Sequence, residues 1–277
     1  MTEPTLYPES GFLRLRIDLA YDGTNFFGWG KQPDRRSVQE EVEKAIATIT
    51  QTKIDSIVAG RTDAGVHATG QVIHVDVPEG VNLDEIAYKL NRILDENIRI
   101  LEVSIAPEAF HARFSALRRS YTYKILDKNL PIPPISRFDI ASWYRPLDEN
   151  LMNKASALVL GHHDFAAFCK FREGGTTIRT LEKFNWRRDG DVLISTIVAD
   201  AFCYSMVRNL VGAVVCVADG RKDPSWMGEL LSNKERVSDS LVFPARGLTL
   251  SSVEYPSNDQ LLERAKVTIG KRGNGSH

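Results

Sequence analysis

The chain has 277 residues, with 35 lysine and arginine residues against 36 aspartate and glutamate residues, so its formal net charge at pH 7 is −1. A chain of this length can form one large or two ordinary domains with well-buried cores, and we expect two. Its 43% hydrophobic and 26% charged residues exclude a largely disordered chain, and the near-neutral charge argues weakly against a nucleic-acid partner.

Apolar and polar residues alternate along residues 12–21, which predicts a half-buried strand that ends at the turn Asp22-Gly23. Residues 24–30 hold three aromatic residues and two glycines, a composition that also fits a hairpin tip or a loop at a domain edge. Residues 37–40 have the pattern of a capping box and predict a helix start. In this half, strands are expected at residues 12–21, 54–59, 71–77 and 98–105, and helices at residues 37–49 and 82–94.

Residues 107–110 are expected to form a hinge before a second half. Phe165, Phe168 and Phe171 recur there at helical spacing and are core residues or, alternatively, a platform on which bases stack. The residues from 257 onward are polar, and we expect them to fray. In this half, strands are expected at residues 120–126, 138–144, 177–188, 192–199 and 247–255, and helices at residues 151–160, at residues 206–218 and from residue 223.

Strands and helices follow each other in a similar order in both halves. This order predicts an α+β fold of two similar halves around an extended, mainly antiparallel sheet with helices on one side. The opposite face of that sheet would then form a central cleft. The expected boundaries are residues 1–108 for the N-terminal half, residues 109–256 for the C-terminal half and residues 257–277 for a polar tail.

Targeting signals are not evident in the sequence. Residues 1–11 are polar and contain two prolines, unlike a secretory signal, and no apolar run approaches the length of a membrane span. We therefore expect a cytoplasmic protein. Cys169, Cys203 and Cys216 are odd in number and widely spaced, and we expect three free thiols rather than a disulfide or a zinc site.

The turn Gly60-Arg61-Thr62-Asp63-Ala64-Gly65 lies between two expected strands, where functional loops are usually found. Its aspartate has two interpretations. Asp63 could hydrogen-bond its own backbone in the turn, as most Asp-x-Gly aspartates do. As a nucleophile it would have to stay ionised in a partly dry site, which requires a guanidinium close by.

Arg208 is the single charged residue of the apolar segment 206–218. It could extend to solvent or pair with a carboxylate, since an unpaired buried charge is costly. A second basic feature is the segment 111–124, which contains no acidic residue. The neutral total therefore still permits a basic cleft. The basic residues of this segment are Arg113, Arg118, Arg119 and Lys124.

Five sequence blocks together resemble the tRNA pseudouridine synthase A family. They occur in the order typical of that family and span the chain from about residue 14 to about residue 255. Five blocks in order are far more specific than any one of them. The blocks are Tyr21-Asp22-Gly23 followed by Phe27-Gly28-Trp29, Ser37-Val38-Gln39-Glu40, Gly60-Arg61-Thr62-Asp63-Ala64-Gly65-Val66-His67, Phe110-His111-Ala112-Arg113-Phe114-Ser115-Ala116 and Met206-Val207-Arg208-Asn209.

The resemblance implies a pseudouridine synthase core assembled as a homodimer. It implies the isomerisation of uridine to pseudouridine in the anticodon stem-loop of tRNA, at positions 38 to 40, without a cofactor or metal. The target nucleotide would be flipped out of its stack. The carboxylate would attack C1′ of the ribose or C6 of the base, and both routes remain open.

The resemblance also implies roles for individual residues. Asp63 matches the catalytic aspartate, Tyr121 the tyrosine that stacks on the target base, and Arg208 the arginine that pairs with the aspartate. Arg61 matches a basic residue beside the flipped nucleotide. The remaining residues implied in substrate binding are Arg113, Arg118, Arg119 and Leu248.

The chain departs from the family pattern at positions that flank the site. Gly30 stands where many relatives have a larger polar side chain, and residues 202–205 lack the histidines often found there. Two rival functions compete with the enzyme: a non-catalytic RNA-binding protein and a metal-dependent hydrolase. The hydrolase would use His67, His74, His111, His162 and His163, but no His-x-x-x-His pair supports it.

Overall fold

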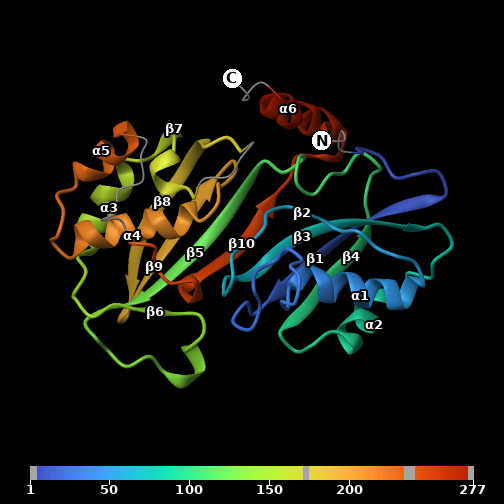
Figure 1. Cartoon of the computed structure of the whole chain (residues 1–277), viewed down its shortest axis with the longest axis horizontal. Coiled ribbons are helices and arrows are strands. Elements are labelled where there is room, and N and C mark those ends of the chain that lie inside the picture. The colour runs from blue at the N-terminus through green and yellow to red at the C-terminus, as the bar shows by residue number, and fades with distance from the viewer. Residues whose placement is uncertain (1–4, 171–174, 234–240, 274–277) are drawn as a thin grey trace. The chain divides into compact units, whose positions relative to one another are not determined.

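The computed structural model describes residues 5–170, 175–233 and 241–273, with side chains described up to residue 270 (Figure 1). These residues form two compact units. Unit 1 comprises residues 5–117 and 250–273, and unit 2 comprises residues 118–249 except for the gaps at 171–174 and 234–240. In the described part of the chain, no helix is long and apolar enough to cross a membrane.

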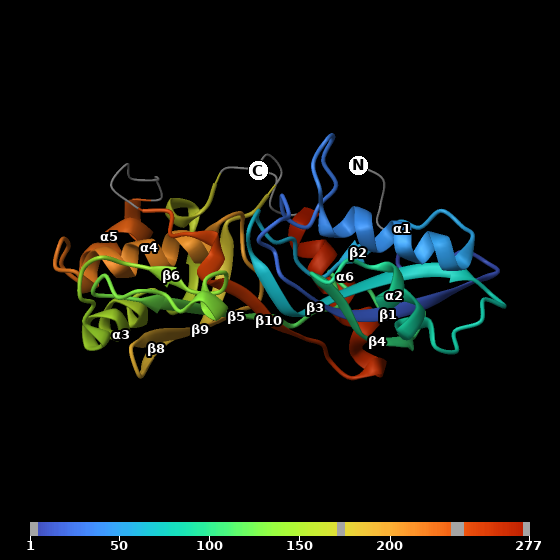
Figure 2. The ribbon, with the colours of Figure 1, turned by 90° about the horizontal axis from the view of Figure 1, so that it is seen from below.

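The sheet of unit 1 has the strand order β4-β1-β3-β10, in which β1 is antiparallel to both β3 and β4, and β2 is antiparallel to β3. The register joins Ile17 of β1 to Ile73 of β3 and to Val103 of β4. Figure 2 shows α1 running along one side of β1 and β3. The elements are β1 (Phe12–Tyr21), α1 (Val38–Thr50), β2 (Ile57–Val58), β3 (His67–Pro78), α2 (Ile86–Ile93), β4 (Ile98–Ile105), α6 (Leu261–Gly273) and, from its third residue onward, β10 (Leu248–Glu254).

Unit 2 contains the antiparallel strand order β5-β9-β8-β7, with the short β6 parallel to β5. The helix α4 is almost fully buried, and Arg208 is its only residue that is not. The elements are β5 (Arg118–Leu126), β6 (Ala141–Ser142), α3 (Glu149–Ala157), β7 (Gly161–Asp164), β8 (Ile178–Asp189), β9 (Val192–Ala199), α4 (Met206–Ala218) and α5 (Trp226–Asn233), with short 3-10 turns at Pro134–Ser136, Ala166–Phe168 and Ala245–Gly247.

The predicted α+β class with a mainly antiparallel sheet is confirmed. The expected strand at residues 138–144 is wrong for most of its length, because only Ala141 and Ser142 pair with β5. The capping box is also wrong. Ser37 precedes α1 in extended geometry, but its hydroxyl makes no capping hydrogen bond, and Glu40 instead pairs with Lys44 at 2.7 Å.

The prediction that the residues after 257 fray is wrong, because residues Leu261–Gly273 form α6. Leu261 and Ala265 are buried, and Leu261 packs in a cluster with Val72 of β3 and Phe110. Arg264 donates to the carbonyl oxygen of Ala116 at 3.3 Å. A short apolar stripe within a polar segment was therefore enough to dock this helix on unit 1.

The expectation of three free thiols is wrong for two of the cysteines. Cys169 and Cys203 form a disulfide with their Cα atoms 5.8 Å apart, while Cys216 is a buried free thiol. The two partners are 34 residues apart, so sequence spacing gave no sign of the pairing. Phe165 and Phe168 are buried core residues, and Phe171 lies outside the described residues.

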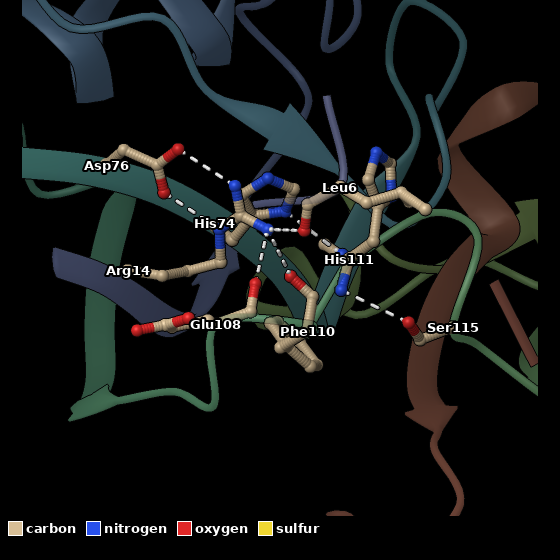
Figure 3. Close-up of polar contacts among 9 residues, drawn as sticks. Leu6, Arg14, His74, Asp76, Glu108, Phe110, His111 and Ser115 are labelled. Atoms are coloured by element: carbon tan, nitrogen blue, oxygen red, sulfur yellow. Dashed lines mark hydrogen bonds and ion pairs between the residues drawn. The ribbon is translucent and has the colours of Figure 1, made fainter. Parts of the chain in front are cut away.

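A buried guanidinium holds residues 107–112 against β1 and β3 in unit 1 (Figure 3). The Arg14 side chain is 1% exposed and forms a two-pronged ion pair with Asp76 through two bonds of 2.8 Å. It also donates to the carbonyl oxygens of Leu6, Glu108 and Phe110 at 2.8, 2.9 and 3.0 Å. A charge with this many partners offsets much of its desolvation cost, and losing one partner would be destabilising.

Two histidine rings complete this anchor (Figure 3). His74 Nδ1 accepts the Ala112 N–H at 3.0 Å, and His111 Nδ1 accepts the Phe114 N–H at 3.1 Å. The two rings meet edge to face at 4.9 Å between centroids. Burial, and secondly the nearby Arg14 and His111, lower the pKa of His74 from 6.5 to about 2.

We expect unit 1 to lose stability in acid because of His74. Between pH 6.5 and pH 2 the unfolded histidine binds a proton that the folded one does not, so stability falls as the pH drops, by about 1.4 kcal/mol per unit. His74→Asn keeps an acceptor for Ala112 and does not titrate. Between pH 7 and pH 5 its free energy of unfolding in urea should therefore fall by about 2 kcal/mol less than that of the wild type. The control is His162→Asn at an exposed position, and an equal pH dependence in all three proteins would contradict the prediction.

Candidate active site

The loop that carries Asp63 connects β2 to β3 in unit 1. Asp63 is half-buried, Thr62 before it is buried, and Arg61 is exposed. The Val66 N–H donates to the Asp63 carbonyl oxygen at 3.2 Å, and Gly65 has φ of +76°. The loop is thus a tight turn that leaves the aspartate side chain partly accessible.

A buried network of hydrogen bonds supports the Asp63 loop. The Tyr21 hydroxyl lies 2.8 Å from Thr62 Oγ1 and accepts from Gln71 Nε2 at 3.2 Å. Gln71 Nε2 also donates to the Gly60 carbonyl oxygen at 2.9 Å. Burial raises the pKa of Tyr21 to about 12, against the opposing effect of these two hydrogen bonds, so its hydroxyl stays protonated near neutral pH.

The segment after β1 also packs against the Asp63 loop through backbone hydrogen bonds. The Trp29 N–H donates to the Thr62 carbonyl oxygen at 3.1 Å, and the Gly65 N–H donates to the Phe26 carbonyl oxygen at 3.2 Å. Trp29 and Phe26 are buried at 0% and 3% exposure, whereas Phe27 is 47% exposed. The aromatic residues of the segment 24–30 therefore form a small core beneath the loop, and only Phe27 presents its ring outward.

Glycine is required at two positions of this contact. A Cβ atom on Gly23 would lie 2.0 Å from the Val66 carbonyl oxygen. A Cβ atom on Gly28 would lie 2.8 Å from the Thr62 carbonyl oxygen, and Gly28 has φ of +93°. The backbones of the two segments can approach this closely only without side chains.

Basic side chains occur on the Asp63 loop itself and on residues 35–36, which follow the segment packed against it. The Arg61 guanidinium lies 3.9 Å from the position that a Cβ on Gly30 would take. The Arg35 and Arg36 guanidinium groups lie 4.9 and 4.4 Å from the ring centroids of Phe27 and Phe26. Arg36 also pairs with Glu41 at 2.5 Å and with Asp95 at 3.2 Å, so its charge is largely balanced.

Tyr121 lies on β5 of unit 2, opposite Ile197 of β9. It is 6% exposed, and its ring meets Phe202 edge to face at 5.1 Å. On the same strand, Arg119 is buried and donates to the Asp200 carbonyl oxygen at 2.7 Å. The neighbouring Arg118 pairs with Glu182 at 3.2 Å.

Arg208 is half-buried on α4. Its Nε donates to the Phe243 carbonyl oxygen at 2.8 Å, and the Phe243 N–H donates to the Arg208 carbonyl oxygen at 3.1 Å. This pair ties α4 to the segment that leads into β10. Leu248 begins β10 and is buried.

Arg113 is exposed in a turn of unit 1 whose neighbouring residues are buried, and its guanidinium lies 5.5 Å from the Phe114 centroid. The structure thus brings Asp63 and Arg61 together in one loop, and Tyr121, Arg118 and Arg119 together on one strand. Sequence reasoning missed Thr62, Tyr21 and Gln71 as the support of Asp63. The spacing of these three residues in the sequence does not predict their contact, because the contact forms only when β1 pairs with β3.

The histidines are engaged in local hydrogen bonds. His67 Nδ1 accepts the Gly23 N–H at 3.1 Å, and His162 Nδ1 lies 3.0 Å from Thr180 Oγ1. His163 Nε2 lies 2.8 Å from the Leu160 carbonyl oxygen. Among the residues that the structure describes, no three His, Cys, Asp or Glu side chains are grouped so that they could hold a metal ion.

Comparison with known proteins gives matches over most of the chain. A family model described as tRNA pseudouridine synthase matches residues 19–115 and 155–256. A tRNA pseudouridine synthase A from Frankia casuarinae is 49% identical over 264 residues, which cover 95% of this chain and 96% of that protein. A protein of the same name from Mycobacterium leprae is 43% identical over 283 residues, which cover 97% of this chain and 98% of the relative.

A solved structure described as a Cbf5-Nop10-Gar1 complex aligns with a TM-score of 0.31 at 10% identity. The alignment covers 73% of this chain and 54% of that chain. At this score the similarity supports no statement about the chain.

We expect Gly28→Ala to destabilise unit 1 far more than Gly80→Ala. Both glycines have positive φ, +93° and +88°, but a Cβ on Gly80 would have no heavy atom within 4 Å. Gly80→Ala should therefore cost only the backbone strain, about 1–2 kcal/mol. Gly28→Ala adds the clash with the Thr62 backbone and should cost a further 1–3 kcal/mol, roughly, in urea unfolding. Equal losses in the two variants would show that the contact of the two segments is loose.

Proposed function

Because the chain belongs to the tRNA pseudouridine synthase family, we propose that it converts uridine to pseudouridine in the anticodon stem-loop of tRNA, at positions 38 to 40, with Asp63 as the nucleophile. Membership in this family makes the chain an isomerase that acts on uridine in tRNA. The observation that carries the finer proposal is the aspartate loop, which lies inside the matched range 19–115 and presents a half-buried carboxylate.

The rigid setting of Asp63 supports its role as a nucleophile. Covalent catalysis needs a carboxylate held within a fraction of an ångström of its target, and such precision comes from the residues that support it. Tyr21, Thr62 and Trp29 give the loop this support through the hydrogen bonds described above. Nucleophilic attack then divides a difficult exchange into easier steps.

The proposed reaction balances without a co-reactant. The bond between C1′ and N1 of uracil breaks, the base turns, and a bond forms between C1′ and C5. C5 loses a proton and N1 gains one, so substrate and product have the same composition. Attack of Asp63 at C1′ of the ribose and attack at C6 of the base would both lead to pseudouridine.

We assign the other residues by their match to the family motifs. Tyr121 stacks on the flipped base and takes part in removing the C5 proton. Arg208 keeps Asp63 ionised, because a carboxylate in a partly dry site needs a nearby cation. Arg61, Arg113, Arg118, Arg119 and Leu248 contact the substrate. The protein acts in the cytoplasm as a homodimer.

Asp63→Asn should abolish pseudouridine formation, because the amide has the shape of the carboxylate but is not a nucleophile. We expect turnover of unmodified tRNA to fall at least about a thousandfold, with tRNA affinity nearly unchanged. A pseudouridine-specific chemical adduct measures the product, and filter binding measures the affinity. The control is Asp55→Asn, an exposed aspartate 3.7 Å from Lys53. Near-normal turnover of Asp63→Asn would remove it as the nucleophile, and a wild type that binds tRNA without forming product would favour the non-catalytic alternative.

Tyr121→Phe separates stacking from proton transfer. The ring remains, so we expect the KM for tRNA to change less than threefold, roughly, while kcat falls by about 10² or more, the usual size of an acid–base contribution. Steady-state kinetics of adduct formation measure both quantities. If kcat were unchanged and Tyr121→Ala raised only KM, Tyr121 would be a stacking residue alone.

A further inference from the structure

A loop of unit 2 combines exposed aromatic rings with basic side chains. It comprises residues 128–146, between β5 and α3, and we call it the aromatic-basic loop. Figure 1 shows it in yellow-green, extending beyond β5 and β6. Ile135, Phe138 and Tyr144 are 92%, 39% and 58% exposed. Three large, exposed side chains in a single loop make it a candidate interaction surface.

Each exposed ring of the loop lies beside a guanidinium. Arg137 lies 4.1 Å from the Phe138 ring centroid, and Arg145 lies 5.3 Å from that of Tyr144. Among the described residues, neither arginine forms an ion pair with a carboxylate. The one acidic residue of the loop, Asp139, is paired with Lys124 at 2.6 Å. The loop therefore presents uncompensated positive charge next to its rings.

The aromatic-basic loop is held in shape before any partner binds. The Asn129 and Lys128 N–H groups donate to the carbonyl oxygens of Trp143 and Arg145 at 3.1 and 3.3 Å, which closes the base of the loop. The Trp143 N–H donates to the Leu126 carbonyl oxygen at 2.8 Å, beside the pairing of β6 with β5. Three prolines between residues 131 and 134 restrict the backbone further. A preformed surface loses little entropy on binding.

We propose that the aromatic-basic loop binds unpaired nucleotides of the tRNA substrate, with bases stacking on Phe138 and Tyr144 and phosphates contacting Arg137 and Arg145. The inference rests on the proposed function for the identity of the RNA. Aromatic faces beside guanidinium groups fit unpaired bases, because a duplex hides the base faces and offers mainly phosphates and 2′-hydroxyls. A protein-binding surface would account for the exposed rings. It would account less well for two arginines beside those rings that are not paired with carboxylates.

Unit 1 supplies a matched pair for comparison. Tyr88 of α2 is 60% exposed, and the Arg92 guanidinium lies 5.9 Å from its ring centroid. Four acidic residues, Asp84, Glu85, Asp95 and Glu96, flank this helix in the sequence. This ring and guanidinium lie on α2, outside the aromatic-basic loop, so variants of Tyr88 and Arg92 control for the general effects of losing a surface ring or charge.

The stacking test uses F138A/Y144A against Y88A. Loss of stacked bases should raise the KM for unmodified tRNA about tenfold or more, with kcat within about twofold of wild type. Y88A should change neither. In direct binding, F138A/Y144A should lose affinity for an RNA stem-loop and keep its affinity for a blunt duplex of equal length. Circular dichroism and thermal melting establish that each variant is folded, and the single variants F138A and Y144A serve if the double variant is not.

The charge test uses R137Q/R145Q against R92Q. Each lost contact with a single-strand phosphate should reduce the slope of log Kd against log salt by about 0.7, so the double variant should lose about 1.4 and R92Q nothing. A slope equal to that of the wild type, or a KM for F138A/Y144A no higher than for Y88A, would overturn the proposal. Equal loss of stem-loop and duplex binding would overturn the stacking role.

These outcomes are separable from a failure of the proposed function. A wild-type protein that formed no pseudouridine would contradict the proposed reaction, while the binding arms would still report on the loop. A wild-type enzyme with normal turnover whose loop variants matched their controls would contradict the loop inference alone. Capture of a protein partner by the loop with unchanged RNA affinity would also contradict it.

Discussion

The close contact between the segment after β1 and the turn before β3 is the constraint on which the candidate site depends. The Trp29 N–H and the Tyr21 hydroxyl reach the backbone and the side chain of the same residue, Thr62. Thr62 immediately precedes Asp63, so contacts from outside the turn hold the backbone next to the aspartate. Gly28 lies so close to the Thr62 backbone that a residue with a Cβ atom would clash at this position.

The Arg14 anchor applies a similar constraint to the chain segment that leaves unit 1. Three of the five hydrogen bonds of Arg14 go to backbone carbonyl groups, two of them at Glu108 and Phe110. The His74 and His111 rings then accept N–H groups of the same segment. The part of this segment at residues 107–110 was expected to be a hinge. Within unit 1 it is instead tied down by buried polar groups, which are costly to separate because each would be left without a partner.

Periodicity predicted the strands β1, β4 and β9 and the helix α4 at or very near their bounds, because each has a clean apolar pattern. It failed where tertiary contacts decide. The helix α6 forms because Leu261 and Ala265 find a surface to bury against, and Cys169 meets Cys203 across a separation of 34 residues. In the same way, Asp63 was open to both interpretations from its turn sequence, and its support by Tyr21 becomes visible only through the pairing of strands.

Charge patterning was the weakest guide, because a basic residue in the sequence need not be a free charge in the fold. Of the basic segment 111–124, Arg118 pairs with Glu182, Lys124 pairs with Asp139, and Arg119 is buried against a carbonyl oxygen. The aromatic-basic loop shows the reverse, because it was not expected to be basic and a strand was expected over its residues 138–144. Asp139 is the one acidic residue of that loop, and its ion pair with Lys124 of the segment 111–124 balances its charge. This ion pair leaves the arginines of the aromatic-basic loop without a compensating charge in the loop. Net charge and local runs therefore have to be weighed after ion pairs are assigned.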